Sequence, residues 1–325
     1  MSEPLLSLEN LEVSFPAGAV VRGVSLSVKR GETLGVVGES GSGKTMTALS
    51  ALRLVPEPGR VTAGKIVFEG KNLLELSEKD MRQIRGGRIA MIFQDPMTSL
   101  NPVFTIGDQI AESVALHKGV SKSEAKLAAI EALRRVQIPD AERRARQYPH
   151  ELSGGMRQRA MIAMALASEP DVLLADEPTT ALDVTVQAQI LTLIRKLQQE
   201  LGMAVIFITH DLGVVAQVCD RVAVLYGGQV MEEADVYTLF ANPKHPYTQG
   251  LLNSLPERTL APPNSGAGGA LNFIPGQPPT RPSEISGCPF RPRCSQAVEK
   301  CVEPLPTTIL PKEHLVRCHR VTRVE

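Results

Sequence analysis

The sequence has no excess of charge, no long apolar run and no leader-like N-terminus. Lysine plus arginine and aspartate plus glutamate each number 35 among 325 residues, so no overall field attracts the chain to nucleic acid or anionic lipid. The apolar run Met161–Ala167 is far too short to cross a membrane, and no basic segment followed by an apolar stretch opens the chain. We therefore expect a cytosolic protein that reaches a membrane only through a partner.

Cysteine is scarce and unevenly placed. Cys219 stands alone, and the other four cysteines fall within the last 38 residues. These four are Cys288, Cys294, Cys301 and Cys318, with five, six and sixteen residues between them. Four thiolates suit a tetrahedral zinc ion or an iron–sulfur cluster, although the C-x-x-C of common zinc ribbons is missing. The four cysteines could therefore hold an iron–sulfur cluster, hold a zinc ion or remain unligated thiols. His314 and His319 are spare candidate ligands if one cysteine does not bind.

One stretch fits the pattern G-x-x-x-x-G-K-[ST], which cradles the phosphates of a nucleotide. Its residues are Gly38, Glu39, Ser40, Gly41, Ser42, Gly43, Lys44 and Thr45. Glycines let the backbone curl so that its N–H groups face an anion, and the partial positive charge of a helix N-terminus adds to the site. We predict a buried strand over residues 32–37 and a helix over residues 44–54, with Lys44 on the β- and γ-phosphates and Thr45 on Mg²⁺.

Strands and helices alternate along much of the chain, which predicts an α/β fold on a mainly parallel sheet with both faces covered. Residues 6–28 depart from this alternation, because their pattern predicts a β-hairpin-like element. Phe15 ends its first strand and either stacks on an adenine base or packs in the core. Residues 105–147 show only helical periods, which predicts a helical insertion without strands.

Four polar side chains follow predicted strands at the edge where open α/β sheets bind ligands. They are Gln94, Asp176, Glu177 and His210. Asp176 suits Mg²⁺ coordination, and Glu177 directly after it is placed to orient or deprotonate an attacking water. We expect Gln94 to contact Mg²⁺ and the water through its amide, and His210 to hydrogen-bond a γ-phosphate. Together the four groups predict metal-assisted phosphoryl transfer to water.

A second helix start suited to phosphate lies after the insertion. Ser153, Gly154 and Gly155 open a predicted helix, and a helix N-terminus favours an anion. One chain has one nucleotide to hold, yet this chain carries two such ends. The simplest explanation is that the second end serves the nucleotide of a partner subunit.

In their order and spacing these motifs resemble the ATPase subunit of an ABC transporter, over residues 5 to about 255. The resemblance implies a P-loop NTPase fold with an antiparallel β subdomain and a helical subdomain at about residues 100–168. It also implies that the helical insertion grips a transmembrane subunit near Gln94. The chain departs from the family pattern at Phe15, where the family often has tyrosine, so the ring face for adenine remains and the hydroxyl is lost.

The same resemblance implies two subunits clamped head to tail around two ATP molecules. Ser153 and Gly155 of one subunit would face the γ-phosphate bound by the other. Glu177 would be the catalytic base and His210 its partner. Asp183, in the motif Ala181-Leu182-Asp183, would make a contact across the interface.

Three further places resemble one branch of this family. Residues 93–102 and 242–248 are similar to peptide and nickel importers, and the cysteine tail is similar to the D-type subunit of dipeptide and oligopeptide importers. That branch implies an F-type ATPase partner, two permeases, an external peptide-binding protein and a [4Fe–4S] cluster on the tail cysteines. The alternatives are the same role for nickel or another small solute, a soluble ABC ATPase outside transport, and an iron–sulfur switch with secondary ATP turnover.

Composition divides the chain into three parts. Residues 1–254 carry the ATPase motifs, and residues 288–325 form the cysteine tail. Residues 255–287 contain seven prolines and five glycines, which is typical of an extended linker. As an importer ATPase the chain is expected on the cytoplasmic face of the cell membrane, without nucleic-acid partners.

Overall fold

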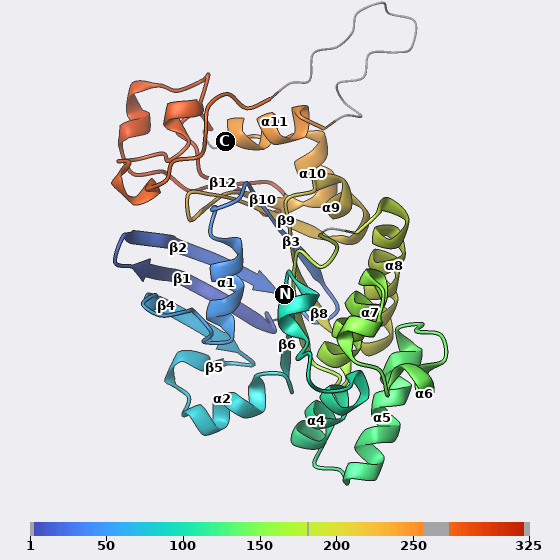
Figure 1. The fold of residues 1–325 in the computed structure, drawn as a ribbon. Coiled ribbons are helices and arrows are strands. Elements are labelled where there is room, and N and C mark those ends of the chain that lie inside the picture. The colour runs from blue at the N-terminus through green and yellow to red at the C-terminus, as the bar shows by residue number, and fades with distance from the viewer. Residues whose placement is uncertain (1–2, 181, 256–272, 322–325) are drawn as a thin grey trace, which may run out of the picture. The chain divides into compact units, whose positions relative to one another are not determined.

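The computed structural model describes residues 3–180, 182–255 and 273–321, and these form two compact units (Figure 1). Unit 1 holds residues 3–5, 28–32, 75–180 and 182–208, and unit 2 holds residues 6–27, 33–74, 209–255 and 273–321. Part of the expected linker (256–272), Ala181 and the last four residues lie outside the described residues. Within the described ranges, no helix is long and apolar enough to span a membrane.

Unit 2 contains an antiparallel sheet in the order β2-β1-β4-β5. Its strands are β1 (Leu6–Phe15), β2 (Gly18–Val28), β4 (Arg60–Phe68) and β5 (Lys71–Asn72). In β1 the side chains of Leu6, Leu8, Leu11 and Val13 are buried among more exposed neighbours, which explains why this segment forms a strand over a core. This sheet confirms the predicted antiparallel β subdomain.

A second group of strands in unit 2 has the order β11-β12-β10-β9-β3. They are β3 (Thr33–Val37), β9 (Arg221–Tyr226), β10 (Gln229–Asp235), β11 (Thr308–Leu310) and β12 (His314–Val316). Strands β3 and β9 are parallel, and the other pairs are antiparallel. The helices of unit 2 are α1 (Lys44–Ala51), α9 (Leu212–Val218), α10 (Val236–Ala241) and α11 (Pro246–Asn253).

Unit 1 is built on parallel strands in the order β8-β7-β6, with every residue of the three strands buried. They are β6 (Ile89–Ile92), β7 (Val172–Asp176) and β8 (Ala204–Thr209). The helices are α2 (Glu78–Ile84), α3 (Pro96–Ser99), α4 (Ile106–Lys118), α5 (Lys122–Arg135), α6 (Ala141–Arg144), α7 (Gly154–Leu166) and α8 (Val184–Leu201). Figure 1 shows α4, α5 and α6 grouped together, as the helical insertion predicts. The mixed α/β architecture confirms the predicted fold class.

The cysteine tail is part of the core of unit 2. Strand β12 pairs with β10, and the buried ring of Phe290 lies with its centroid 5.2 Å from those of both Tyr226 and Tyr247. The carboxylate of Glu232, fully buried, accepts hydrogen bonds from two backbone N–H groups and contacts His314 Nε2 at 2.7 Å. The tail therefore shares sheet pairing, aromatic packing and a buried polar network with the rest of this unit.

Replacing Glu232 with alanine is expected to lower the free energy of unfolding by about 3 kcal/mol, because buried polar partners lose their acceptor. The partners are the backbone N–H groups of Lys244 and His245 and the ring of His314. Urea unfolding measures the change, with the exposed Glu299→Ala as the matched control. Equal stability of the two variants would contradict the anchoring role of Glu232.

Acid is expected to destabilise unit 2 through His245. Burial lowers the pKa of this imidazole to about 4, although Glu232 partly offsets the shift. Between pH 6.5 and 4 the unfolded chain binds a proton here and the folded chain does not, so stability falls as the pH drops through this window, by about 3 kcal/mol in total. His245→Asn keeps an acceptor for the N–H of Tyr247 and removes the titration. Urea midpoints at pH 7.5 and 5 should then differ less in the variant, and an unchanged difference would contradict this assignment.

Candidate functional site

The phosphate loop joins β3 to α1 and follows a path that only glycine allows at two points. Gly38 has φ of +155°, and a Cβ there would lie 2.2 Å from the carbonyl oxygen of Leu225. Gly43, the N-cap of α1, has φ of +99°, and its Cβ would lie 2.8 Å from the carbonyl oxygen of Val20. Both positions explain why the sequence places glycine at the two ends of the loop.

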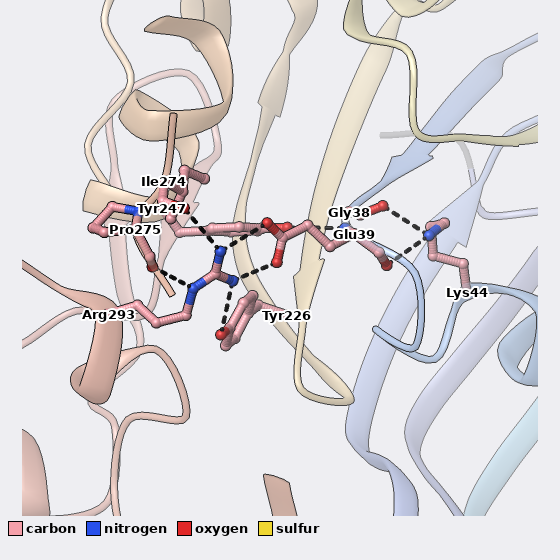
Figure 2. Close-up of polar contacts among 8 residues, drawn as sticks. All are labelled: Gly38, Glu39, Lys44, Tyr226, Tyr247, Ile274, Pro275 and Arg293. Carbon is pink, nitrogen blue, oxygen red and sulfur yellow. Dashed lines mark hydrogen bonds and ion pairs between the residues drawn. The ribbon is translucent and has the colours of Figure 1, made fainter. Parts of the chain in front are cut away.

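Lys44 is buried and its ammonium group lies inside the loop (Figure 2). The Nζ atom donates to the carbonyl oxygens of Gly38 at 2.8 Å and Glu39 at 3.0 Å, and it lies 3.4 Å from Ser42 Oγ. The loop therefore concentrates a positive charge and a helix N-terminus at one place, which suits a phosphate group. Thr45 follows in the first turn of α1.

The structure brings together two of the residues predicted at strand ends. Gln94 Nε2 donates to Glu177 Oε2 at 3.1 Å, and Thr180 Oγ1 donates to the same oxygen at 2.9 Å. The backbone N–H of Glu177 donates to the carbonyl oxygen of Ile208, and φ of Glu177 is +46°. Such a conformation is uncommon for a side chain of this size and concentrates at functional sites. Glu177 is thus held in one orientation by partners on both sides.

The oxygen donors at these positions fit a magnesium ion. Asp176 ends β7 with only 2% of its surface exposed, directly before Glu177. The amide oxygen of Gln94 takes no part in its bond to Glu177. In unit 2, Thr45 carries a hydroxyl at the start of α1. Carboxylate, amide and hydroxyl oxygens are hard ligands of the kind that Mg²⁺ prefers.

The second predicted helix start is present in unit 1. Ser153 is the N-cap of the thirteen-residue helix α7, where its Oγ accepts from the N–H of Met156 at 3.3 Å. A Cβ on Gly154 would meet nothing within 4 Å, so open space lies beside this helix start. Asp183 caps the next helix in the same way, because its Oδ1 accepts from the N–H of Val186 at 2.9 Å.

Gln158 has no predicted role in the sequence motifs, and the structure places it beside the loop that follows β7. Its side chain is 2% exposed, and Nε2 donates to the carbonyl oxygen of Pro178, one residue after Glu177. Gln158 therefore ties α7 to the loop that carries the predicted base. The sequence held one signal for this role. Gln158 precedes Met161 by three residues and Ile162 by four, so it lies on the same, buried face of α7 as these apolar residues.

Phe15 is the last residue of β1, and His210 is the first residue after β8. The half-buried ring of Phe15 covers Gly59, where a Cβ would come within 2.4 Å of the ring. His210 directly follows β8 and is exposed. Their roles toward adenine and the γ-phosphate stay predictions.

The tail cysteines do not form the predicted [4Fe–4S] site, and that prediction is wrong. Across residues 3–180, 182–255 and 273–321, no group of three or more His, Cys, Asp or Glu side chains is placed to hold a metal ion, which also removes the zinc alternative. The cavity that the four cysteines border measures only about 10 Å³, at the lower limit for one water molecule. These residues are Cys288, Cys294, Cys301 and Cys318. Of the spare ligands, His314 is paired with Glu232.

The physical reason lies in close packing. Cys288, Cys301 and Cys318 are buried, and the space that the four cysteines border is too small for a cluster. Burial also raises the pKa of Cys288 to about 11 and raises the pKa of Cys294 and Cys318, so these thiols are protonated at neutral pH when no metal is bound. They contribute as small apolar groups to the packing of the tail. The spacing of the cysteines in the sequence identified four candidate metal ligands but did not show how they pack.

Comparison with known families gives two matches within this chain. Residues 21–180 match the family described as ABC transporter. Residues 231–301 match the family described as oligopeptide/dipeptide transporter, C-terminal region. The second match begins within β10 and covers α10, α11 and the first three tail cysteines.

Individual proteins match over nearly the whole chain. The chain is 53% identical to a probable peptide ABC transporter ATP-binding protein of Sinorhizobium fredii, y4tR, over 98% of this chain and 96% of that one. It is 51% identical to the dipeptide transport ATP-binding protein DppD of Bacillus subtilis (97% and 94%) and 49% identical to the oligopeptide transport ATP-binding protein OppD of Salmonella typhimurium (91% and 88%). None of these names mentions an iron–sulfur cluster.

Solved structures show the same cassette fold. A post-hydrolysis dimer of the ATP-binding cassette MJ0796 with ADP and Pi matches with a TM-score of 0.63 at 29% identity, over 71% of this chain and 98% of that one. The cbiO1 subunit of Clostridium perfringens matches with a TM-score of 0.65 at 29% identity, over 74% and 92%. Fold, phosphate loop and whole-chain identity agree, and the chain belongs to the ABC transporter family, among the ATP-binding subunits of peptide transporters.

Proposed function

We propose that this chain is the D-type ATPase subunit of a heterodimeric peptide importer on the cytoplasmic face of the cell membrane. As a member of its family the chain hydrolyses ATP to ADP and phosphate and so powers peptide import. The proposal adds the subunit type, the residue roles and the partners. The observation that carries it is the 51% identity to DppD, which extends over 97% of the chain and so includes the tail.

Each residue of the two sites has a proposed role in hydrolysis. Lys44 and the N–H groups of the phosphate loop bind the β- and γ-phosphates, and Phe15 stacks on adenine. Glu177 takes the proton of the attacking water, and its bond from Gln94 supports this role because it fixes the carboxylate. His210 hydrogen-bonds the γ-phosphate. Thr45, Gln94 and Asp176 would hold Mg²⁺, which would supply positive charge against the charge that develops on the phosphates.

The second phosphate-binding end serves a partner ATPase of the F-type. Ser153, Gly154 and Gly155 face the γ-phosphate held by the partner, and Asp183 contacts the partner across the interface. The open space beside Gly154 supports this role, because a phosphate can approach the helix start closely.

The segment between β6 and α4 docks a permease. Four of its apolar side chains are exposed, at 38% to 70% of their surface, which is typical of an interaction site. They are Phe93, Met97, Val103 and Phe104. Gln94 lies within this segment and bonds to Glu177, so the docking surface adjoins the catalytic carboxylate. The full transporter would contain two permeases and an external peptide-binding protein.

The proposed organisation keeps three parts: the ATPase domain 1–254 with its helical subdomain at about 100–168, the Pro/Gly-rich segment 255–287, and the tail 288–325. In the described residues, segment 273–287 contacts the ATPase domain, where Arg22 donates to the carbonyl oxygen of Pro282 at 2.8 Å. This contact supports the proposal that the C-terminal end of the Pro/Gly-rich segment packs against the ATPase domain.

Co-expression with peptide-importer permeases and a second ATPase subunit tests the proposal. We expect a complex with one copy of this chain, one of a different ATPase and two permeases, measured by native mass spectrometry. Peptide with its binding protein should stimulate hydrolysis of ATP, and nickel should not. Two copies of this chain in the complex would contradict the heterodimer, and stimulation by nickel alone would contradict the peptide substrate.

A further inference from the structure

A residue of the tail reaches the phosphate loop from 254 positions away in the sequence (Figure 2). Arg293 Nη1 and Nη2 lie 2.5 and 3.1 Å from the two carboxylate oxygens of Glu39, the second residue of the loop. The same guanidinium donates to the hydroxyl of Tyr226 and to the carbonyl oxygens of Ile274 and Pro275. Five hydrogen bonds thus fix the guanidinium between the loop and the C-terminal segment.

The backbone of Glu39 is held as well. Its N–H donates to the hydroxyl of Tyr247 at 2.9 Å, and its carbonyl oxygen accepts from Lys44 Nζ at 3.0 Å. The side chain, the N–H and the carbonyl of one loop residue therefore each have a partner. Two of these partners come from the C-terminal part of the chain, and the third is the lysine that we expect to bind phosphates. A shift of the tail would therefore be passed through Glu39 to Lys44 Nζ.

The C-terminal segment also borders the space beside the loop. A cavity of about 400 Å³ is lined by Ser40, Gly41 and Ser42 on one side and by residues 277–280 and Pro282 on the other. Arg293 also bonds Ile274 and Pro275, so it holds the start of the same segment. The segment and the loop are therefore fastened by a common side chain.

The charges of Arg293 and Glu39 bear directly on the binding of a nucleotide. The side chain of Arg293 is 6% exposed and that of Glu39 is 25% exposed, so water screens this pair only in part. Burial disfavours the charged guanidinium, but the hydrogen bonds that it donates to Glu39 and Tyr226 outweigh burial and raise the pKa of Arg293 above its ordinary value. Without Arg293 a carboxylate would stand unpaired next to a loop that binds a triphosphate, and like charges repel.

We propose that Arg293 is a positioning residue for ATP binding. By pairing with Glu39 it fixes the phosphate loop and removes a negative charge beside the phosphates, so the C-terminal segment sets the affinity for ATP. This inference rests on the proposed function of the loop, and it gives the tail a task that needs no metal.

The test compares four variants of the full-length chain: Arg293→Gln, Glu39→Gln, the double variant, and Arg281→Gln as a matched control. Arg281 forms an exposed ion pair with Glu284 at 2.9 Å in the same segment. Affinity is measured with a fluorescent ATP analogue, and KM and kcat for ATP by phosphate release. Arg293→Gln should weaken binding and raise KM by about tenfold, the effect of one hydrogen bond to a charged group, with kcat changed less than about twofold. Arg281→Gln should match the wild type.

The double variant separates charge from a purely structural role. If the unpaired carboxylate is the cause, Glu39→Gln in the Arg293→Gln background should recover at least about half of the lost binding free energy. No recovery, or wild-type KM in Arg293→Gln, would overturn the inference. If Arg293→Gln fails to fold, Arg293→Lys replaces it in the test, because lysine keeps the positive charge but cannot bond both carboxylate oxygens in parallel. Arg293→Lys should raise KM for ATP by about threefold. An unchanged KM in that variant would overturn the inference. A wild-type chain that binds no ATP would instead reject the proposed function itself.

Discussion

Replacing Glu177 with glutamine is expected to stop ATP hydrolysis and to leave ATP binding intact. Glutamine has the shape of glutamate, and its amide oxygen can still accept from Gln94 Nε2 and Thr180 Oγ1, so the local geometry is kept. Glutamine cannot accept the proton of the attacking water, and loss of a general base lowers kcat by about 10²- to 10⁴-fold. Because ATP then persists, the variant and its ATPase partner should remain together as a closed dimer in the presence of ATP and Mg²⁺.

Phosphate release, binding of a fluorescent ATP analogue and size-exclusion chromatography measure the three parts of this expectation. The matched control is Glu200→Gln, the same chemical change in an exposed side chain of unit 1 that forms an ion pair with Lys196 at 3.6 Å. The control should hydrolyse ATP at the wild-type rate. If Glu177→Gln hydrolysed ATP at a rate close to that of the control, Glu177 could not be the catalytic base.

Replacing Lys44 with alanine is expected to abolish ATP binding at ordinary concentrations. The buried ammonium group would lose its contacts with the β- and γ-phosphates, and hydrogen bonds to charged groups contribute about 1.5–3 kcal/mol each. Two such contacts correspond to a loss of affinity of roughly a hundredfold or more. Hydrolysis should fall in parallel, because no nucleotide is held.

The Lys44→Ala variant needs a control for folding, since Lys44 Nζ also bonds the carbonyl oxygens of Gly38 and Glu39. Circular dichroism and urea unfolding should show a folded chain. Lys196→Ala removes an exposed lysine from unit 1 and should bind ATP like the wild type. Wild-type affinity in the folded Lys44→Ala chain would contradict the phosphate-loop assignment.

Much of the site could be predicted because its parts are local. The phosphate loop needs only a strand, a few glycines and a helix in sequence, and the structure forms β3, the loop and α1 in that order. The contact between Gln94 and Glu177 follows from topology. Both residues come just after parallel strands, β6 and β7, which are neighbours in the sheet, so their ends meet at one edge.

The contact between Arg293 and Glu39 could not be predicted, because no pattern in the sequence links residues 254 positions apart. The proline and glycine content of residues 255–287 favoured an extended linker, which gave no reason to look for contacts there. The same limit applied to the tail cysteines. Their spacing identified four candidate ligands, but whether they form a metal site depends on packing, and among the described residues no group of three or more such side chains is placed to hold a metal ion.

The most direct test of the account is peptide uptake into proteoliposomes that contain this chain, its ATPase partner and the two permeases, with the peptide-binding protein outside and ATP inside. We predict uptake of a labelled dipeptide that requires ATP and falls to background with Glu177→Gln, while Glu200→Gln sustains it. Uptake that persists with Glu177→Gln, or ATP hydrolysis that never moves peptide, would contradict the claim that hydrolysis by this chain powers peptide import.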